Sequence, residues 1–160
     1  MSATPLFDAP RPTGDIVVAF FVAGLPVPGG SKVAYPIRGR GGRMHVAVKD
    51  SSGPPGQRWR AAVQIVASEA RTDPPLEGAL GVTMCFTLPR AKWHTGTRGL
   101  KPSAPAWPMT RPDVLKLARA VEDACTGIIW RDDAQIVREL LVKTYGERIG
   151  VTVTIAELEA

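Results

Sequence analysis

The sequence is poor in the residues that bind transition metals or cross-link small proteins. Its 160 residues include two cysteines, Cys85 and Cys125, and two histidines, His45 and His94. Two thiols are too few for a disulfide framework, and so little His and Cys argues against a zinc site. We therefore expect two buried, reduced thiols in a cytoplasmic protein.

Long hydrophobic runs are also missing. A membrane-spanning helix needs about 20 consecutive apolar residues, and the stretch Ile16–Leu25 is much shorter, so we interpret it as a strand. Residues 1–14 lack the basic start and apolar core of a signal peptide, and their Pro-rich composition predicts a flexible tail. Because 44% of the sequence is hydrophobic, residues 15–160 can form one domain with a modest core, and no membrane partner is expected.

Aromatic residues make up only 6% of the sequence. A basic protein that binds single-stranded DNA, or an accessory protein of DNA packaging, would need aromatic platforms on which bases stack. The low content, mostly at core-like positions, disfavours this alternative.

Positive charge is plentiful and unevenly placed. The formal net charge is +5, and half of the 20 basic residues lie in two segments without acids, 28–49 and 89–111. Both segments are rich in Gly or Pro and are expected to be loops or ribbons. Clustered cations on loops suit a phosphate backbone, and the alternative is that they are solvated for solubility. The predicted DNA-binding residues are Lys32, Arg38, Arg40, Arg43, Arg90, Lys92, Trp93, Arg98, Lys101 and Arg111.

The pattern of apolar residues predicts an α+β fold. Apolar positions recur at helical spacing over 57–70 and 112–125, and at strand spacing in the segments between them. We expect a single small domain with a mixed β-sheet and two main helices packed on it. The predicted strands and ribbons are 15–24, a hairpin over 34–50, 81–90, 134–146 and 148–158, with a long loop from 89 to about 110.

Acidic residues next to these basic segments are the candidates for chemistry. Asp113 lies at the start of the second helix, and Asp132 and Asp133 lie in the turn after it. Carboxylates brought together from different parts of a fold hold hard divalent cations, which phosphodiester hydrolysis uses. The alternatives are structural. Thr110 and Pro112 could start the helix with Asp113 in its first turn, and the other two could be ordinary turn acids.

Other polar residues near these acids have simpler interpretations. Glu122 and Asp123 fit solvated helix positions that can pair with Arg119. Cys125 falls on the apolar face of the helix and is a poor nucleophile. His94, beside Trp93 in the basic loop, is interpreted as a DNA-contacting or surface residue.

One long segment resembles a known family. Residues 111–137, RPDVLKLARAVEDACTGIIWRDDAQIV, resemble the RusA signature, roughly K-P-D-x-D-[NK]-L-x-[KR]-x-x-x-D-A-L-x-G followed after a few residues by D-D-x-Q-[VI]. Upstream, PVPGGSK at 26–32 looks like the family's turn after its first strand. LPRAKWHTG at 88–96 looks like its basic loop.

The resemblance implies a homodimeric, magnesium-dependent endonuclease of a phage or prophage. Such enzymes resolve four-way DNA junctions by paired, symmetric nicks in recombination and repair, and Mn²⁺ is expected to substitute for Mg²⁺. By motif position, Asp113 and Asp133 are catalytic metal ligands, and Asp132, beside Asp133, is given as a further metal-binding residue. Arg119 takes the place of the catalytic-site Lys or Arg. Lys32 would contact a phosphate, and Trp93 and Trp107 would stack or wedge at the crossover.

One departure from the family pattern affects the metal site. The second aspartate of the signature falls on Leu115, which cannot bind a metal, and Glu122 is seven residues of helix away. The ion would then keep more water, or a carboxylate such as Asp50 or Glu69 would move in. The alternative function is a protein that binds branched DNA with weak or no nuclease activity.

Overall fold

A four-stranded mixed sheet forms the base of the molecule. The computed structural model describes residues 14–30 and 32–159, apart from the side chains of Lys32, Lys49 and Asp50, so the predicted tail lies almost wholly outside the described residues. The strand order is β1-β8-β4-β7, in which β4 and β7 are parallel and the other pairs are antiparallel. The strands are β1 (Asp15–Ala23), β4 (Leu80–Leu88), β7 (Ile136–Tyr145) and β8 (Gly150–Glu157).

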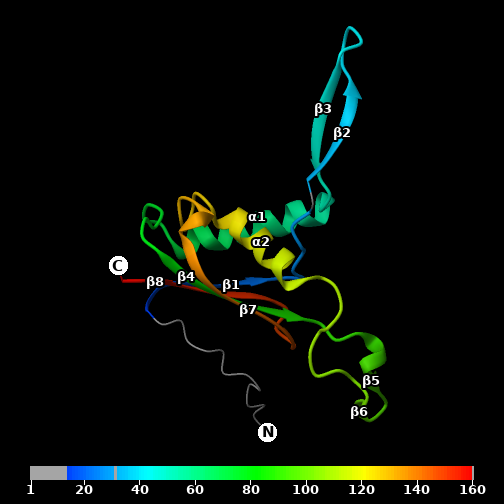
Figure 1. Ribbon diagram of the computed structural model, residues 1–160. Helices are drawn as coiled ribbons and strands as arrows, with labels where there is room; N and C mark the ends of the chain where they lie inside the picture. Colours follow the sequence, from blue (N-terminus) through cyan, green and yellow to red (C-terminus); the bar gives the residue numbers. More distant parts are fainter. Residues whose placement is uncertain (1–13, 31, 160) are drawn as a thin grey trace.

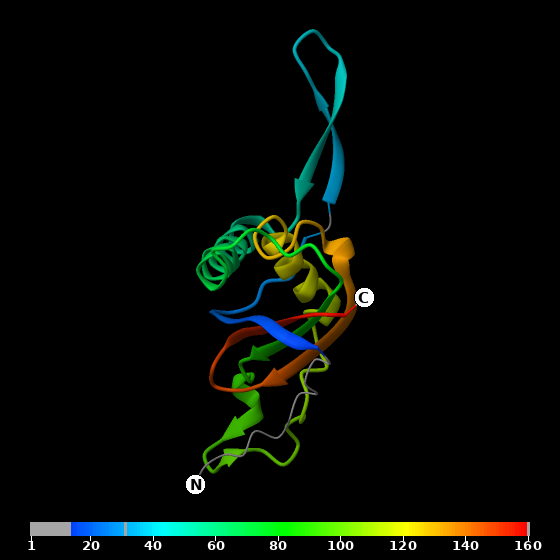
Figure 2. The same cartoon turned by 90° about the vertical axis from the view of Figure 1, so that its left-hand side faces the viewer.

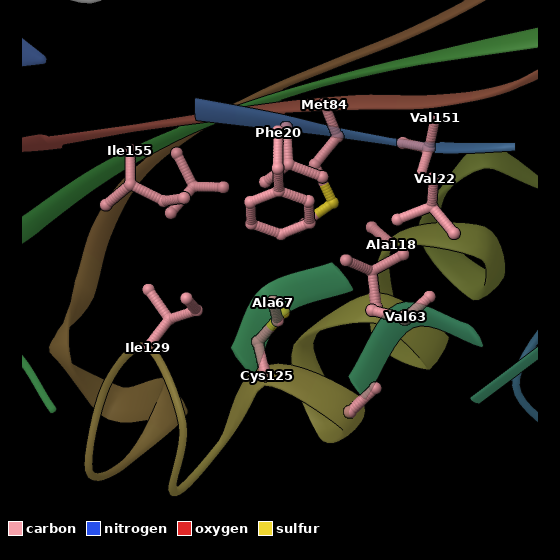
Figure 3. Close-up of a cluster of buried hydrophobic side chains, with 14 of the residues drawn as sticks. Phe20, Val22, Val63, Ala67, Met84, Ala118, Cys125, Ile129, Val151 and Ile155 are labelled. Carbon is pink, nitrogen blue, oxygen red and sulfur yellow. The ribbon is translucent and has the colours of Figure 1, made fainter. Parts of the chain in front are cut away.

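Two helices cover one face of this sheet. They are α1 (Gly53–Ala70) and α2 (Val114–Cys125), and α2 belongs to the crossover that joins the parallel strands β4 and β7 (Figure 1). Side chains of the sheet meet side chains of both helices in one apolar layer (Figure 3). The expected α+β class, with a mixed sheet and two main helices, is confirmed.

Helix boundaries differ from the predicted ones for local reasons. Helix α1 begins at Gly53, four residues earlier than predicted, and Pro54 and Pro55 lie in its first turn, where a missing N–H is tolerated. Helix α2 begins at Val114 instead of Pro112. It ends before Gly127, whose φ of +82° is the left-handed conformation that glycine adopts easily after a helix.

The predicted hairpin is present and stands apart from the body. Its strands are β2 (Lys32–Arg38) and β3 (Met44–Asp50), paired antiparallel. Figure 1 and Figure 2 show it projecting from one end of the molecule. Residues 89–111 project from the opposite end and contain a short 3₁₀ turn, η1 (Lys92–His94), and a small ribbon of β5 (Thr95–Gly96) and β6 (Gly99–Leu100). In the part of the chain that the structure describes, no helix is long and apolar enough to cross a membrane.

Candidate active site

Helix α2 presents one polar flank beside its buried face. Leu117, Val121 and Ala124 are fully buried, which fixes the rotation of the helix on the sheet. At helical spacing, Leu115, Arg119 and Glu122 then share a flank, with Arg119 one turn from each of the others. Leu115 is 70% exposed, so the position where the family signature has an aspartate faces solvent.

Asp113 precedes this helix and its carboxylate is not used as a cap. It occupies the N-cap position in an extended conformation, and its side chain makes no capping hydrogen bond. The structural alternative, with Thr110 as cap and Asp113 in the first turn, is therefore wrong, because the helix begins one residue after Asp113. The exposed carboxylate lines a cavity of about 600 Å³ together with Arg111 and Lys116.

Lys143 holds the backbone that leads into Asp113. Its Nζ donates to the carbonyl oxygens of Thr110, at 2.9 Å, and Pro112, at 2.8 Å. The two acceptors lie where the long basic loop passes into helix α2. Lys143 therefore links strand β7 to the segment that positions Asp113.

The turn after α2 is built around Gln135. Asp132 Oδ1 accepts from the Ala134 N–H at 2.8 Å, and Gln135 Oε1 accepts from the Asp132 N–H at 3.0 Å, a capping box at η2 (Asp133–Gln135). Gln135 Nε2 also donates to the carbonyl oxygens of Leu76 and Gly78. Asp132 is thus a turn-forming acid, whereas the Asp133 side chain is exposed and stands outside the capping box.

Glu122 on α2 has Glu139 in contact with it and lies within electrostatic reach of Asp133. Glu122 is half-buried and shares a side-chain hydrogen bond with Glu139. Burial raises the pKa of Glu122 to about 8, and the hydrogen bond and negative charge of Glu139, with smaller effects of Asp133 and Asp123, add to the rise. The expectation of a solvated Glu122 that pairs with Arg119 is therefore wrong, because the sheet edge brings a carboxylate to it instead.

Glu139 and Lys143 were missed as candidates because β7 has apolar and charged residues on both faces, so its pattern does not show which face meets the helices. In the register with β4, Glu139, Leu141 and Lys143 pair with Val82, Met84 and Phe86, whose side chains lie in the core. Paired residues of neighbouring strands share a face, so these residues of β7 face the helices. Charged residues at a spacing of four were the only signal in the sequence.

The structure brings Glu139 into contact with Glu122 and leaves Asp133 within electrostatic reach of Glu122, while Asp113 is at the other end of α2. Nine residues separate Asp113 from Glu122, roughly 13 Å along the axis of a helix. Glu69 is exposed on α1, and the side chain of Asp50 lies outside the described residues. Among the residues that the structure describes, no three His, Cys, Asp or Glu side chains form a group that could hold a metal ion.

The predicted DNA-binding residues fall at the two ends of the molecule. Arg38, Arg40 and Arg43 are exposed at the tip of the β2–β3 hairpin, and the side chain of Lys32 lies outside the described residues. Lys92, Trp93, Arg98, Lys101 and Arg111 are exposed on the opposite loop, residues 89–111 (Figure 1).

Two residues of this loop, Arg90 and His94, contact other parts of the protein. Arg90 is half-buried, donates to the Pro105 carbonyl oxygen at 2.8 Å and lies 4.4 Å from the centroid of the Tyr145 ring. His94 is only 2% exposed, so its expected place at the surface is wrong: the 3₁₀ turn points it inward, against Tyr145.

The two cysteines are free thiols with no place in this site. Burial raises the pKa of Cys125 to about 12, and the charge of Glu122 adds to it, so the thiol stays protonated. Cys85 is half-buried, and burial raises its pKa as well. The expectation that Cys125 is a core residue is confirmed.

Comparisons with known proteins place most of the chain in one family. The sequence model of the family described as endodeoxyribonuclease RusA matches residues 36–156, a range that contains Asp113, Arg119 and Asp133. The chain is also similar to the uncharacterized protein YqaN of Bacillus subtilis strain 168. The two are 29% identical over 148 residues, which cover 89% of this chain and 98% of that protein.

Proposed function

Because the chain belongs to the RusA family and is therefore an endodeoxyribonuclease, we propose that it resolves four-way DNA junctions by paired, symmetric, Mg²⁺-dependent nicks in recombination and repair. The family acts on Holliday junctions and depends in general on divalent metals. The observation that carries the proposal is the family match over 36–156. Within it, the signature residues Asp113 and Asp133 lie before and after α2, and Arg119 lies on it.

The placement of cations supports binding of a branched substrate. Basic residues lie on the hairpin tip at one end and on residues 89–111 at the other (Figure 1, Figure 2). Phosphate contacts at two separated places position a large DNA without reading its sequence. Junction shape, more than base sequence, would therefore select the substrate.

The carboxylates suit a hard divalent cation in their chemistry, although no three of them converge on one point among the described residues. Glu139 and Glu122 offer oxygen donors in contact with each other, and Glu122 retains its proton up to a pH of about 8 when no cation balances its neighbours. Asp133, whose charge acts on Glu122, is the proposed anchor of the ion, and Asp132 shapes its turn.

We also propose Asp113 as a ligand, because its exposed carboxylate makes no capping hydrogen bond to the helix. Asp113 and Glu122 are at opposite ends of α2. Asp113 and Asp133 could therefore bind the same ion only if the structure rearranged.

The residues of the chain have separate tasks in the proposed reaction. A bound divalent cation supplies water activated near neutral pH and neutralises phosphate oxygens. Arg119, which lies on α2 between Asp113 and Glu122, stabilises the charge that develops on the phosphate. It cannot act as a base because guanidinium stays protonated. Lys143 and Gln135 hold the segments that carry Asp113 and Asp133.

We further propose a homodimer, which would match the two-fold symmetry of paired nicks. The hairpin supports it: Val33, Tyr35 and Ile37 on one face and Met44, Val46 and Val48 on the other are all exposed. A two-stranded hairpin alone is marginally stable, and exposed apolar surface of this extent is typical of an interface. We propose that a second copy of the chain covers these apolar side chains.

We also propose a cellular context. Residues 15–160 would form the nuclease domain, and the enzyme would act in the cytoplasm of a bacterial host as part of a phage or prophage. Sparse cysteine and free thiols fit a reducing compartment.

The test is cutting of a synthetic four-way junction and a linear duplex, each labelled on one strand at a time, in Mg²⁺, Mn²⁺ or EDTA. We expect paired nicks in the junction only, and only with the metal. The variant Asp133→Asn should lose nicking by at least about 100-fold while junction binding is kept. The control Asp123→Asn, an exposed neighbour on α2, should cut normally, and retained cutting by Asp133→Asn would contradict its role as ligand.

A junction-binding protein with weak or no nuclease activity is the second candidate, favoured by the exposed Leu115. The variant Leu115→Asp separates the two. Tight junction binding without nicks in either metal, and no gain of cutting in Leu115→Asp, would replace the nuclease proposal with this one.

A further inference from the structure

A cavity beneath the basic loop has walls suited to a nucleobase. Its volume is about 510 Å³, within the size range of ligand pockets. It shares four wall residues with the cavity of Asp113 and is therefore its direct neighbour: Leu25, Leu88, Arg111 and Pro112. Any group bound in it would lie next to one proposed end of the active site.

Aromatic rings form one part of its wall. Trp93 is 61% exposed, and its ring meets the ring of His94 edge-on, with centroids 4.0 Å apart. Tyr145 follows at 5.4 Å from His94 and has the guanidinium of Arg90 over its ring. Trp93, His94, Arg90 and Tyr145 all line the cavity.

The cavity also holds one unused polar group. His94 is 2% exposed, and its Nδ1 is buried with no hydrogen-bond partner within the described residues. A buried nitrogen without a partner lowers stability. Nδ1 is itself covered in this structure, so a ligand with a complementary edge would restore the missing bond once the imidazole turns toward the cavity that His94 lines. Arg90 and Arg111 are the charged residues of the wall, and residues 89–111 contain no acid.

From these walls we infer that the cavity takes up one unstacked nucleobase of the bound DNA. The base stacks on Trp93, its polar edge reaches His94, and Arg111 contacts the adjoining phosphate. Flat aromatic surface, one polar atom and a cationic rim together fit a base and its phosphate, and extrusion costs least where a base is already unpaired. The inference rests on the proposed function for its DNA substrate, and it would set the register of one strand against Asp113.

Binding of the full-length protein to a duplex with a one-nucleotide bulge tests this directly. The bulged nucleotide is either thymidine or an abasic analogue, and binding is measured by fluorescence anisotropy in EDTA. We expect the base-containing bulge to bind ~five-fold tighter, consistent with stacking of a single base. The preference should fall below two-fold in Trp93→Ala.

Two further variants separate the pocket from general effects on the loop. Trp107→Ala removes a tryptophan of the same loop that does not line the cavity, so its base preference should match the wild type. His94→Phe should keep the preference for a base over the abasic site but lose differences among the four bulged bases. Circular dichroism spectra confirm that each variant is folded.

The outcomes separate this inference from the proposed function. No base preference in the wild type, or equal loss in Trp93→Ala and Trp107→Ala, overturns the pocket, even if junctions are nicked. A base preference that depends on Trp93 supports it, even if the nicking experiment fails and the resolvase proposal falls.

Discussion

Glu122 is a carboxyl group that folding moves from water to the neighbourhood of Glu139 and Asp133. The folded protein raises its pKa from 4.5 to about 8, so folding favours the protonated form. Stability from this group is therefore full below pH 4.5 and falls as the pH rises toward 8. Near neutral pH the charged form opposes folding unless a cation is bound.

The variant Glu122→Gln should remove this pH dependence. In EDTA at pH 7.5 we expect it to be more stable than the wild type by about 1–2 kcal/mol, a value reduced because half of the side chain is in contact with solvent. At pH 4 the two proteins should have the same stability. The measurement is urea unfolding from pH 4 to 8.5. Glu69→Gln, at an exposed position on α1, is the control and should follow the wild type. Unfolding curves of Glu122→Gln that run parallel to those of the wild type at every pH would contradict the pKa assignment.

At the scale of elements, strand β7 does more than complete the sheet. It is an edge strand in the described sheet, and one alternation of its side chains faces α2. Glu139 meets the C-terminal half of the helix, and Lys143 meets the backbone just before it. The strand therefore connects both ends of the proposed site.

Lys143→Met should separate positioning from binding. Two carbonyl oxygens lose a charged donor, so stability should fall by about 1–3 kcal/mol. Junction nicking should fall about ten-fold or more through kcat, because Asp113 loses its anchor, while junction Kd changes little. Single-turnover kinetics and thermal unfolding measure these effects. Lys143→Arg keeps a donor and should recover most of the activity; a change in Kd alone would assign Lys143 to DNA binding instead.

The hairpin tip is the second element with a measurable role. Replacing Arg38, Arg40 and Arg43 together by Gln should weaken binding to the junction and to linear duplex alike, because phosphate contacts are not selective. Each lost contact lowers the slope of log Kd against log salt by about 0.9, so a drop of about 2–3 is expected. Anisotropy titrations over a range of NaCl concentrations test this, and an unchanged slope would remove the hairpin from the DNA interface.

At the scale of the whole molecule, the projecting hairpin is the part whose apolar side chains the rest of the chain leaves uncovered. Within the described residues, the hairpin's apolar side chains on both faces remain exposed, although the body has a closed core (Figure 3). Covering them in a dimer would stabilise the hairpin and pair two active sites.

Val46→Lys should shift the proposed dimer to monomers. A lysine would have to be buried in the interface, and we expect dimerisation to weaken by about 100-fold, or about 3 kcal/mol. Sedimentation velocity measures the shift, and junction cutting should change from paired to single nicks. Ile65→Lys, at an exposed apolar position on α1, is the control. A wild-type protein that sediments as a monomer at all concentrations would refute the dimer.

Local pattern was enough to predict the fold class and most elements. The apolar stripe of α2, the hairpin and the β4 strand depend on periodicity and turn residues, which act over a few neighbours. The signature over 111–137 likewise named Asp113, Arg119 and Asp133 from sequence alone. Their proposed roles stay predictions until the variants are measured.

Only the tertiary structure decided which of these residues meet. Strand register placed Glu139 opposite Val82 and so beside Glu122, and it placed Lys143 under the segment before Asp113. The burial of His94 depends on Tyr145, about 50 residues later in the chain. Periodicity describes contacts a few residues apart, whereas register, burial and pKa depend on partners brought together by packing across the chain.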